Sequence, residues 1–167
     1  IDSVTDVVAQ LQRLQELVAR ATEPTTIEGV ARVLVEEGVG VLGAAMGGFW
    51  LIAGDALELV HHVAQQPAER FARLPLTADA PLAACVRERE PIWIEGGDEY
   101  RQRFPASASR IQVNAACVCL PLVVGDRAIG GAVFAFRGDR VFSAPERVSL
   151  AMIARQCAHA VERIELV

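Results

Sequence analysis

The sequence of 167 residues contains no lysine, so all 16 of its basic residues are arginine, and acidic residues outnumber them by 21 to 16. The formal net charge is therefore −5 at pH 7. A protein that neutralises the phosphates of a nucleic acid presents a basic patch or stripe. The charge balance gives no support to such a surface, and we expect no nucleic-acid partner.

Long apolar runs are also missing. No uninterrupted apolar segment reaches about 18 residues, the length at which a transmembrane helix is considered. No basic segment followed by an apolar one opens the sequence, as a secretory signal peptide would. We therefore expect no membrane partner and a cytoplasmic location. The sequence begins with Ile1 and not with Met, which indicates a piece of a longer polypeptide.

Cysteine is scarce, and the four cysteines are Cys85, Cys117, Cys119 and Cys157. They stand in apolar settings, where free cysteine behaves as a small hydrophobic residue, and we interpret them as reduced, buried thiols. Alternation along a strand directs Cys117 and Cys119 to the same face. A metal site needs further ligands, which the sequence does not supply, so we predict no metal ion.

Common catalytic motifs are absent as well. The sequence contains no nucleophile elbow G-x-S-x-G, no P-loop, no H-E-x-x-H zinc motif and no C-x-x-C pair. Without a motif that would place a nucleophile, a general base or a phosphate, no catalytic residue can be named. We therefore expect that the domain itself is not an enzyme.

The clearest periodicity lies at the two ends of the sequence, where apolar residues recur at steps of three and four. This pattern predicts terminal helices over 1–22 and 143–167, the second with Ser143 as N-cap and Glu146 behind it. The apolar stripes on these two helices are wider than is needed to cover one sheet. We expect a homodimer whose interface contains Val4, Val7, Leu11, Leu14, Val18, Leu150, Ile153, Cys157 and Ile164. Alternatively, the two helices pack only on each other and on the sheet of one copy.

Shorter elements fill the middle of the sequence. A second helix follows Pro24, with Thr25 as its expected cap, and a short helix is expected over 81–88. Strands are predicted over 46–52, 57–64, 91–95, 113–124 and 128–137. In 57–64, simple alternation places Leu57, Leu59 and His61 on one face and His62 on the other. Residues 65–78 are expected to be irregular with a short helix around Phe71, and 96–110 to form a loop with at most one helical turn.

Four stretches, in this order and spacing, resemble the GAF domain. They are 44–52 before a hairpin, 90–94 (EPIWI), Leu120-Pro121-Leu122 followed by 126–130, and 142–147 leading into the last helix. The resemblance covers nearly the whole sequence, taken as one domain over 1–167. It implies an α+β fold with a central antiparallel sheet of five to six strands. Terminal helices would cover one face, and short helices and loops would enclose a pocket on the other.

The resemblance also implies a function. GAF domains are found in bacterial signalling proteins beside histidine kinase or protein phosphatase output domains, where they act as sensors of small molecules. A ligand pocket would be lined by aromatic side chains, which bury flat ligands, and by a few polar ones: Trp50, His62, Phe71, Trp93, Tyr100, Phe104, Cys117 and Cys119. The same side chains would equally serve as plain core filling. Neither the ligand nor a cofactor follows from these residues.

Two alternatives to a sensor remain open. The domain could serve for dimerisation and scaffolding, with a pocket filled by its own side chains. More remotely, Cys85, Cys117 and Cys119 loosely match the pocket cysteines of GAF-fold reductases of free methionine sulfoxide. Other relatives fit less well: the cyclic-nucleotide signature Asn-Lys-Phe-Asp-Glu needs a lysine, and bilin attachment needs a Cys-His pair. Both are missing.

Overall fold

An antiparallel sheet of six strands forms the middle layer of the computed structural model, which describes residues 2–63, 72–110 and 115–166. Neighbouring strands follow the order β3-β2-β1-β6-β5-β4, and every neighbouring pair is antiparallel. Gly54 and Gly125 turn two hairpins with positive φ, which glycine adopts without strain. The strands are β1 (Met46–Ala53), β2 (Ala56–Val63), β3 (Arg73–Pro75), β4 (Ile92–Ile94), β5 (Cys117–Val124) and β6 (Arg127–Ala135).

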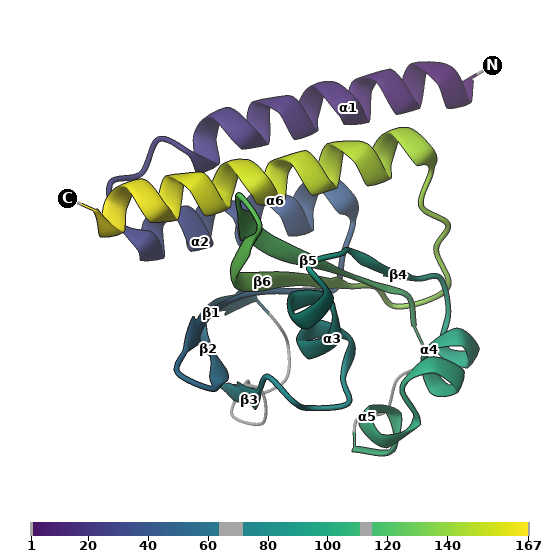
Figure 1. Cartoon of the computed structure of the whole chain (residues 1–167). Helices are drawn as coiled ribbons and strands as arrows, with labels where there is room; N and C mark the ends of the chain where they lie inside the picture. The colour runs from purple at the N-terminus through teal and green to yellow at the C-terminus, as the bar shows by residue number, and fades with distance from the viewer. Residues whose placement is uncertain (1, 64–71, 111–114, 167) are drawn as a thin grey trace.

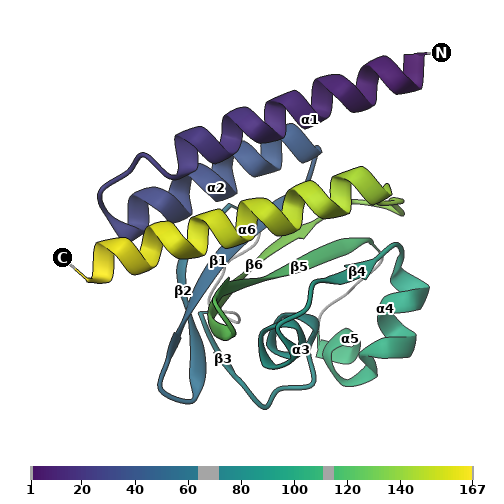
Figure 2. The ribbon, with the colours of Figure 1, turned by 45° about the horizontal axis from the view of Figure 1, so that its top comes forward.

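Helices lie on both sides of this sheet (Figures 1 and 2). The three long helices cover one face: α1 (Asp2–Ala21), α2 (Ile27–Leu42) and α6 (Ala144–Glu165). Helices α1 and α6 run side by side in the same direction. The three short helices lie toward the other face: α3 (Pro81–Glu88), α4 (Gly97–Arg103) and α5 (Pro105–Arg110). The predicted α+β, GAF-like architecture is therefore confirmed.

The alternation of side chains along the strands produces two apolar cores. Phe49, Leu120 and Phe134 point toward the long helices, where they pack with residues of α1, α2 and α6. Neighbouring residues such as Trp50 and Cys119 point the opposite way and pack with the short helices. Because successive side chains of a strand face opposite sides, an apolar strand such as β5 serves both cores. The sheet thus separates the long-helix layer from the short-helix layer.

Strand β2 departs from simple alternation. Its register against β1 shifts between Leu59 and His61, so Val60 has no counterpart on the neighbouring strand. Such a bulge inserts one residue and reverses which face the following side chains occupy. Leu59 therefore packs in the short-helix core, whereas His61 Nε2 lies 2.9 Å from Glu36 Oε2 of α2, on the long-helix side. The prediction that Leu59 and His61 share a face is wrong.

Three other expectations concern helix positions. The N-cap of α2 is Thr26 and not Thr25, since Thr26 Oγ1 accepts a hydrogen bond of 3.0 Å from the Gly29 N–H. Residues 96–110 are more helical than expected, because α4 and α5 occupy most of them. Helix α4 has acidic residues in its first turn and basic ones in its last, which suits the helix dipole. The helix expected around Phe71 lies outside the described residues.

Helix α2 ends in a glycine spacing that matches G-x-G-x-x-G: Gly38, Gly40 and Gly43. In dinucleotide-binding proteins this motif joins a strand to the N-terminus of a helix. Here it lies in the last turns of α2, where a Cβ on Gly38 would come within 2.6 Å of Phe134 Cζ. Gly43 is the C-cap of α2 with a positive φ of 71°, and a Cβ on Gly40 would meet no atom within 4 Å. The position of the spacing at the end of a helix does not fit a nucleotide site. Among the helices that the structure describes, none has both the length and the apolar character needed to cross a bilayer.

Candidate functional site

The sheet face beneath α3 and α4 carries most of the residues predicted to contact a ligand. One apolar cluster contains Trp50 of β1, Tyr100 of α4, the α4 C-cap residue Phe104, and Cys117 and Cys119 of β5. None of the five is more than 7% exposed. Sheet pairing thus brings together residues from three elements that are far apart in the sequence. We refer to these five residues as the candidate ligand cluster.

Glycine allows α3 to come close to this cluster. A Cβ on Gly131 of β6 would lie 2.7 Å from Leu82 Cδ1 and 3.0 Å from Val86 Cγ2, both on α3. The lack of a side chain at Gly131 therefore lets α3 lie close to β6. On the adjacent residue, a Cβ of Gly130 would lie 2.1 Å from the Trp50 carbonyl oxygen. The two glycines set how closely both the helix and the neighbouring strand approach β6.

His62 lies on the same face as the candidate ligand cluster. It pairs with Gly48 of β1, and directly opposite residues of an antiparallel pair point to the same side. A Cβ on Gly48 would come within 2.4 Å of the Trp50 ring, so the indole covers that glycine. His62 is half-buried. The prediction that His62 lies on the face opposite Leu57 and Leu59 is wrong, because the bulge at Val60 returns His62 to their face. Phe71 lies outside the described residues.

Trp93 lies on the opposite side of the sheet from the other predicted ligand residues. In β4 its neighbours Ile92 and Ile94 join the short-helix core, while Trp93 packs against the long-helix core. Its ring centroid is 5.4 Å from that of Phe142, and the Arg147 guanidinium carbon lies 5.1 Å from its centroid. The structure therefore does not bring Trp93 into the candidate ligand cluster.

Burial helps to keep the Cys119 thiol and the Tyr100 phenol of the cluster uncharged near neutral pH. Desolvation raises the pKa of the Cys85 thiol, which faces the cluster from α3, well above its usual range. The hydrogen bond with Cys117, together with burial, raises the pKa of Cys119. Burial also raises the pKa of Tyr100, whose hydroxyl lies 2.8 Å from Ser107 Oγ. The site therefore offers an apolar surface with neutral hydroxyl and thiol groups.

The described residues provide no charged metal centre on this face. Among them, no group of three or more His, Cys, Asp or Glu side chains is arranged to hold a metal ion.

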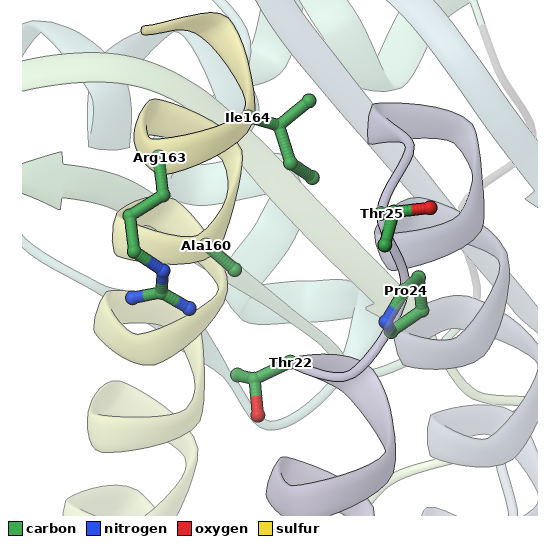
Figure 3. A pocket seen from close by; sticks show the side chains of 6 residues that line it. All are labelled: Thr22, Pro24, Thr25, Ala160, Arg163 and Ile164. Atoms are coloured by element: carbon green, nitrogen blue, oxygen red, sulfur yellow. The ribbon is translucent and has the colours of Figure 1, made fainter. Parts of the chain in front are cut away.

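Two hollows lie away from this face and border α6. One, of about 380 Å³, separates the end of α6 from the α1–α2 connection (Figure 3); it is lined by Thr22, Pro24, Thr25, Ala160, Arg163 and Ile164. The other, of about 230 Å³, is lined by Arg89, Glu90, Pro91, Pro121, Val123, Ala151 and Arg155.

Most residues predicted for a dimer interface contribute to the core of one copy. Leu14, Leu150, Ile153 and Cys157 are buried against the sheet and the other long helices. Half-buried side chains flank them: Val7, Leu11, Val18 and Ile164. Only Val4 of the predicted set is exposed. The heptad stripes therefore cover the sheet, and a dimer would need other side chains at its centre.

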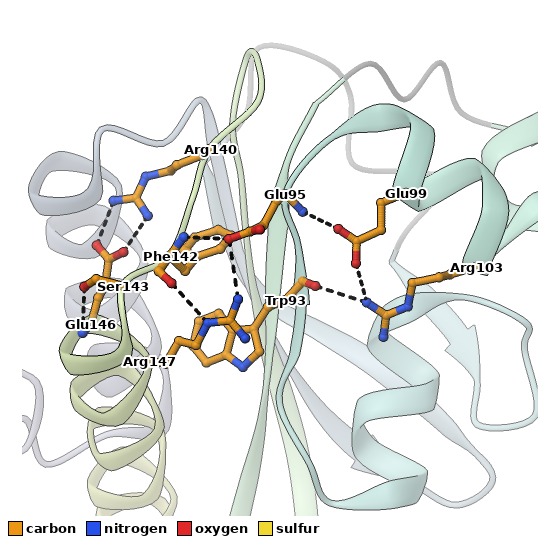
Figure 4. A network of polar contacts seen from close by, with 9 residues as sticks. All are labelled: Trp93, Glu95, Glu99, Arg103, Arg140, Phe142, Ser143, Glu146 and Arg147. Atoms are coloured by element: carbon orange, nitrogen blue, oxygen red, sulfur yellow. Dashed lines mark hydrogen bonds and ion pairs between the residues drawn. The ribbon is translucent and has the colours of Figure 1, made fainter.

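A polar network at the start of α6 was not predicted (Figure 4). Arg140 donates two hydrogen bonds to Glu146, of 2.8 and 2.7 Å. Gln10 of α1 donates a third, of 2.8 Å. Glu146 is only 4% exposed. The Arg140 guanidinium also stacks near the Phe136 and Phe142 rings. The spacing of Ser143 and Glu146 in the sequence predicted that Glu146 is part of a helix cap. No local sequence pattern predicts its contacts with Arg140 or Gln10.

Comparisons with known proteins agree with this arrangement. Residues 24–162 match the sequence model described as "GAF domain". One similar solved structure is the GAF domain of an Acinetobacter phosphoenolpyruvate-protein phosphotransferase, with a TM-score of 0.76 and 13% identity over 95% of this chain and 96% of that one. A search of curated proteins gave no match.

Two other solved structures are similar over most of their length. The GAF-B domain of DevS from Mycobacterium smegmatis has a TM-score of 0.65 and 22% identity, covering 84% of this chain and 96% of that one. A free methionine-R-sulfoxide reductase from Neisseria meningitidis, in complex with its substrate, has a TM-score of 0.71 and 15% identity, covering 92% and 88%. At these identities the similarity shows the fold and leaves activity to be argued from the site.

Proposed function

This chain belongs to the GAF domain family, and from that premise we propose that it is the ligand-binding sensor module of a larger signalling protein. In this proposal a small molecule binds between the sheet and α3–α4, in the candidate ligand cluster. Helices α1 and α6, on the other face of the same sheet, pass the change to a covalently linked output domain in the cytoplasm.

One observation carries the proposal: Trp50, Tyr100, Phe104, Cys117 and Cys119 converge on one sheet face, directly behind the layer of long helices. The cluster is apolar, and the Cys119 thiol and the Tyr100 phenol have raised pKa values that keep them neutral. It therefore favours a flat, uncharged molecule that can stack on aromatic faces and accept one or two hydrogen bonds. Since none of the five residues is more than 7% exposed, a ligand reaches them only when the side chains that cover them move, and such a rearrangement is how a ligand shifts a conformational equilibrium.

The test is a thermal-shift screen with a library of uncharged aromatic and heterocyclic metabolites. A ligand at 100 times its dissociation constant should raise the free energy of unfolding by about 2.7 kcal/mol. The variant Cys119→Leu adds bulk inside the cluster and should abolish the shift. Val148→Leu makes a similar change on the exposed surface of α6 and should preserve it. The proposal would be contradicted if no compound of the library produced a shift, or if the shift were the same in Cys119→Leu as in the wild type.

We infer that the module is non-catalytic, although reductases share its fold. A cysteine nucleophile reacts as the thiolate, which is favoured by nearby positive charge and by access to solvent. Here burial raises the pKa of Cys85, and the hydrogen bond with Cys117 together with burial raises the pKa of Cys119, so both remain protonated near neutral pH. Reduction of free methionine sulfoxide by the protein, lost when Cys85, Cys117 and Cys119 are all changed to serine, would overturn this inference.

A second candidate function is dimerisation through the long helices. Four large apolar side chains remain exposed on α1 and α6, namely Val4, Val8, Val148 and Met152. Because α1 and α6 run in the same direction with their N-terminal ends together, these residues belong to one end of the long-helix layer. A parallel homodimer with its two-fold axis along the helices would cover them.

Introducing charge into this surface should separate a dimer. We expect Val8→Glu combined with Met152→Glu to give monomers by light scattering, because like charges would meet across the two-fold axis. The control pair Thr77→Glu and Gln102→Glu adds the same charge at exposed positions outside the long helices and should leave the dimer intact. Wild-type protein that is monomeric at high micromolar concentration would exclude the interface.

A further inference from the structure

We propose that Glu95 couples the position of α4 to the first turn of α6, and so forms the link between the ligand side of the sheet and the helix layer. The proposal rests on the proposed function only in that α4 borders the candidate ligand cluster. It goes further by assigning the transmission step to one residue and its neighbours.

The two sides of α4 have different partners. Tyr100 and Phe104 are buried in the candidate ligand cluster. Glu99 and Arg103, on the same helix, instead contact the backbone of residues 93–95 and each other, with 3.0 Å between Glu99 Oε2 and an Arg103 guanidinium nitrogen. Because these four residues are neighbours on the last turn of one helix, a displacement of the Tyr100 and Phe104 rings also moves Glu99 and Arg103.

Helix α4 forms hydrogen bonds with the backbone of β4 and of the residue that follows it, Glu95. The Arg103 guanidinium donates to the Trp93 carbonyl oxygen over 3.1 Å. The Glu95 backbone N–H donates to Glu99 Oε1 over 2.9 Å. Figure 4 shows both bonds on the side of β4 that faces α4. These two attachments, two residues apart, tie the end of the edge strand to the helix.

From Glu95 the contacts continue to α6. Its carboxylate oxygen Oε2 accepts a 2.9 Å hydrogen bond from the Phe142 backbone N–H and lies 3.4 Å from an Arg147 guanidinium nitrogen (Figure 4). Its carbonyl oxygen accepts a 3.0 Å bond from the Arg140 N–H. Arg147 in turn donates to the Phe142 carbonyl oxygen over 3.1 Å. Glu95 thus bonds α4 through its N–H and the start of α6 through its carboxylate.

The start of α6 does not depend on Glu95 for its own formation. Ser143 Oγ accepts the Glu146 N–H at 3.2 Å, and Arg140 holds the Glu146 carboxylate. The Glu95–Arg147 pair is more than a third exposed on both sides, so it contributes little to stability. Changing Glu95 should therefore weaken communication between α4 and α6 more than it weakens the fold.

The experiment is a double-mutant cycle read by amide hydrogen exchange, with no ligand present. Phe104→Leu perturbs the cluster side of α4. In the wild-type background it should change the exchange rates of the Phe142 and Arg147 amides by about fivefold. In the Glu95→Gln background the same substitution should change them by less than about twofold, because the route to α6 has been weakened.

A matched control uses Glu162→Gln near the other end of α6, which also removes a carboxylate from an arginine pair, 2.8 Å from Arg127. In that background the full effect of Phe104→Leu should remain. An undiminished effect in Glu95→Gln, or no effect on α6 in the wild-type background, would overturn the proposal. If Glu95→Gln does not fold, Arg147→Gln breaks the same link from α6. Since no ligand is involved, failure of the metabolite screen and failure of this cycle are separate results.

Discussion

Replacing Trp50 with alanine is expected to lower the free energy of unfolding by about 3–5 kcal/mol, the cost typical of truncating a buried aromatic residue. The indole is only 3% exposed and covers Gly48 at the centre of the candidate ligand cluster. Its removal leaves a cavity against β1 that neighbouring side chains cannot fill completely. Urea unfolding of the two proteins measures the difference.

The same variant offers a direct test of whether this face can hold a ligand. Added indole should raise the melting temperature of Trp50→Ala, because an apolar cavity of the right shape binds the group that was removed. Trp93→Ala is the matched control: it removes the same side chain from the opposite face, where the ring is half-buried, and should show no rescue. Equal rescue of both variants, or a negligible loss of stability in Trp50→Ala, would contradict the assignment.

Arg140→Met is expected to lower the free energy of unfolding by about 3 kcal/mol, because it leaves a buried carboxylate without its main partner. Glu146 is 4% exposed and would keep only the Gln10 amide and the helix N-terminus around it.

The appropriate control for this prediction is Arg127→Met. Arg127 also pairs with a glutamate of α6, Glu162, at 2.8 Å, but this pair is considerably more exposed. We expect a change below about 1 kcal/mol. Chemical denaturation of both variants gives the comparison. Equal losses in the two variants would exclude the buried-charge explanation.

The sequence by itself determined the elements whose signals are local. Ser143 caps α6 as predicted, because a side-chain oxygen three residues before a free backbone N–H needs only its own helix. Cys117 and Cys119 share a face because alternation is a property of any strand. The heptad stripes also predicted both terminal helices, but an apolar stripe looks the same whether it covers a sheet or a second copy. Leu14 and Ile153 could therefore not be assigned to the core in advance.

Only the tertiary structure decided which residues meet. The bulge at Val60 places His61 against Glu36, because register depends on pairing with β1 and not on β2 alone. A helix as short as α4 has only marginal stability without packing. Its formation therefore depends on the burial of the Tyr100 and Phe104 rings. Glu95 meets Phe142 and Arg147 across 47 and 52 residues of sequence. No local sequence pattern predicts such contacts, because only the fold determines which distant polar groups can form hydrogen bonds with one another.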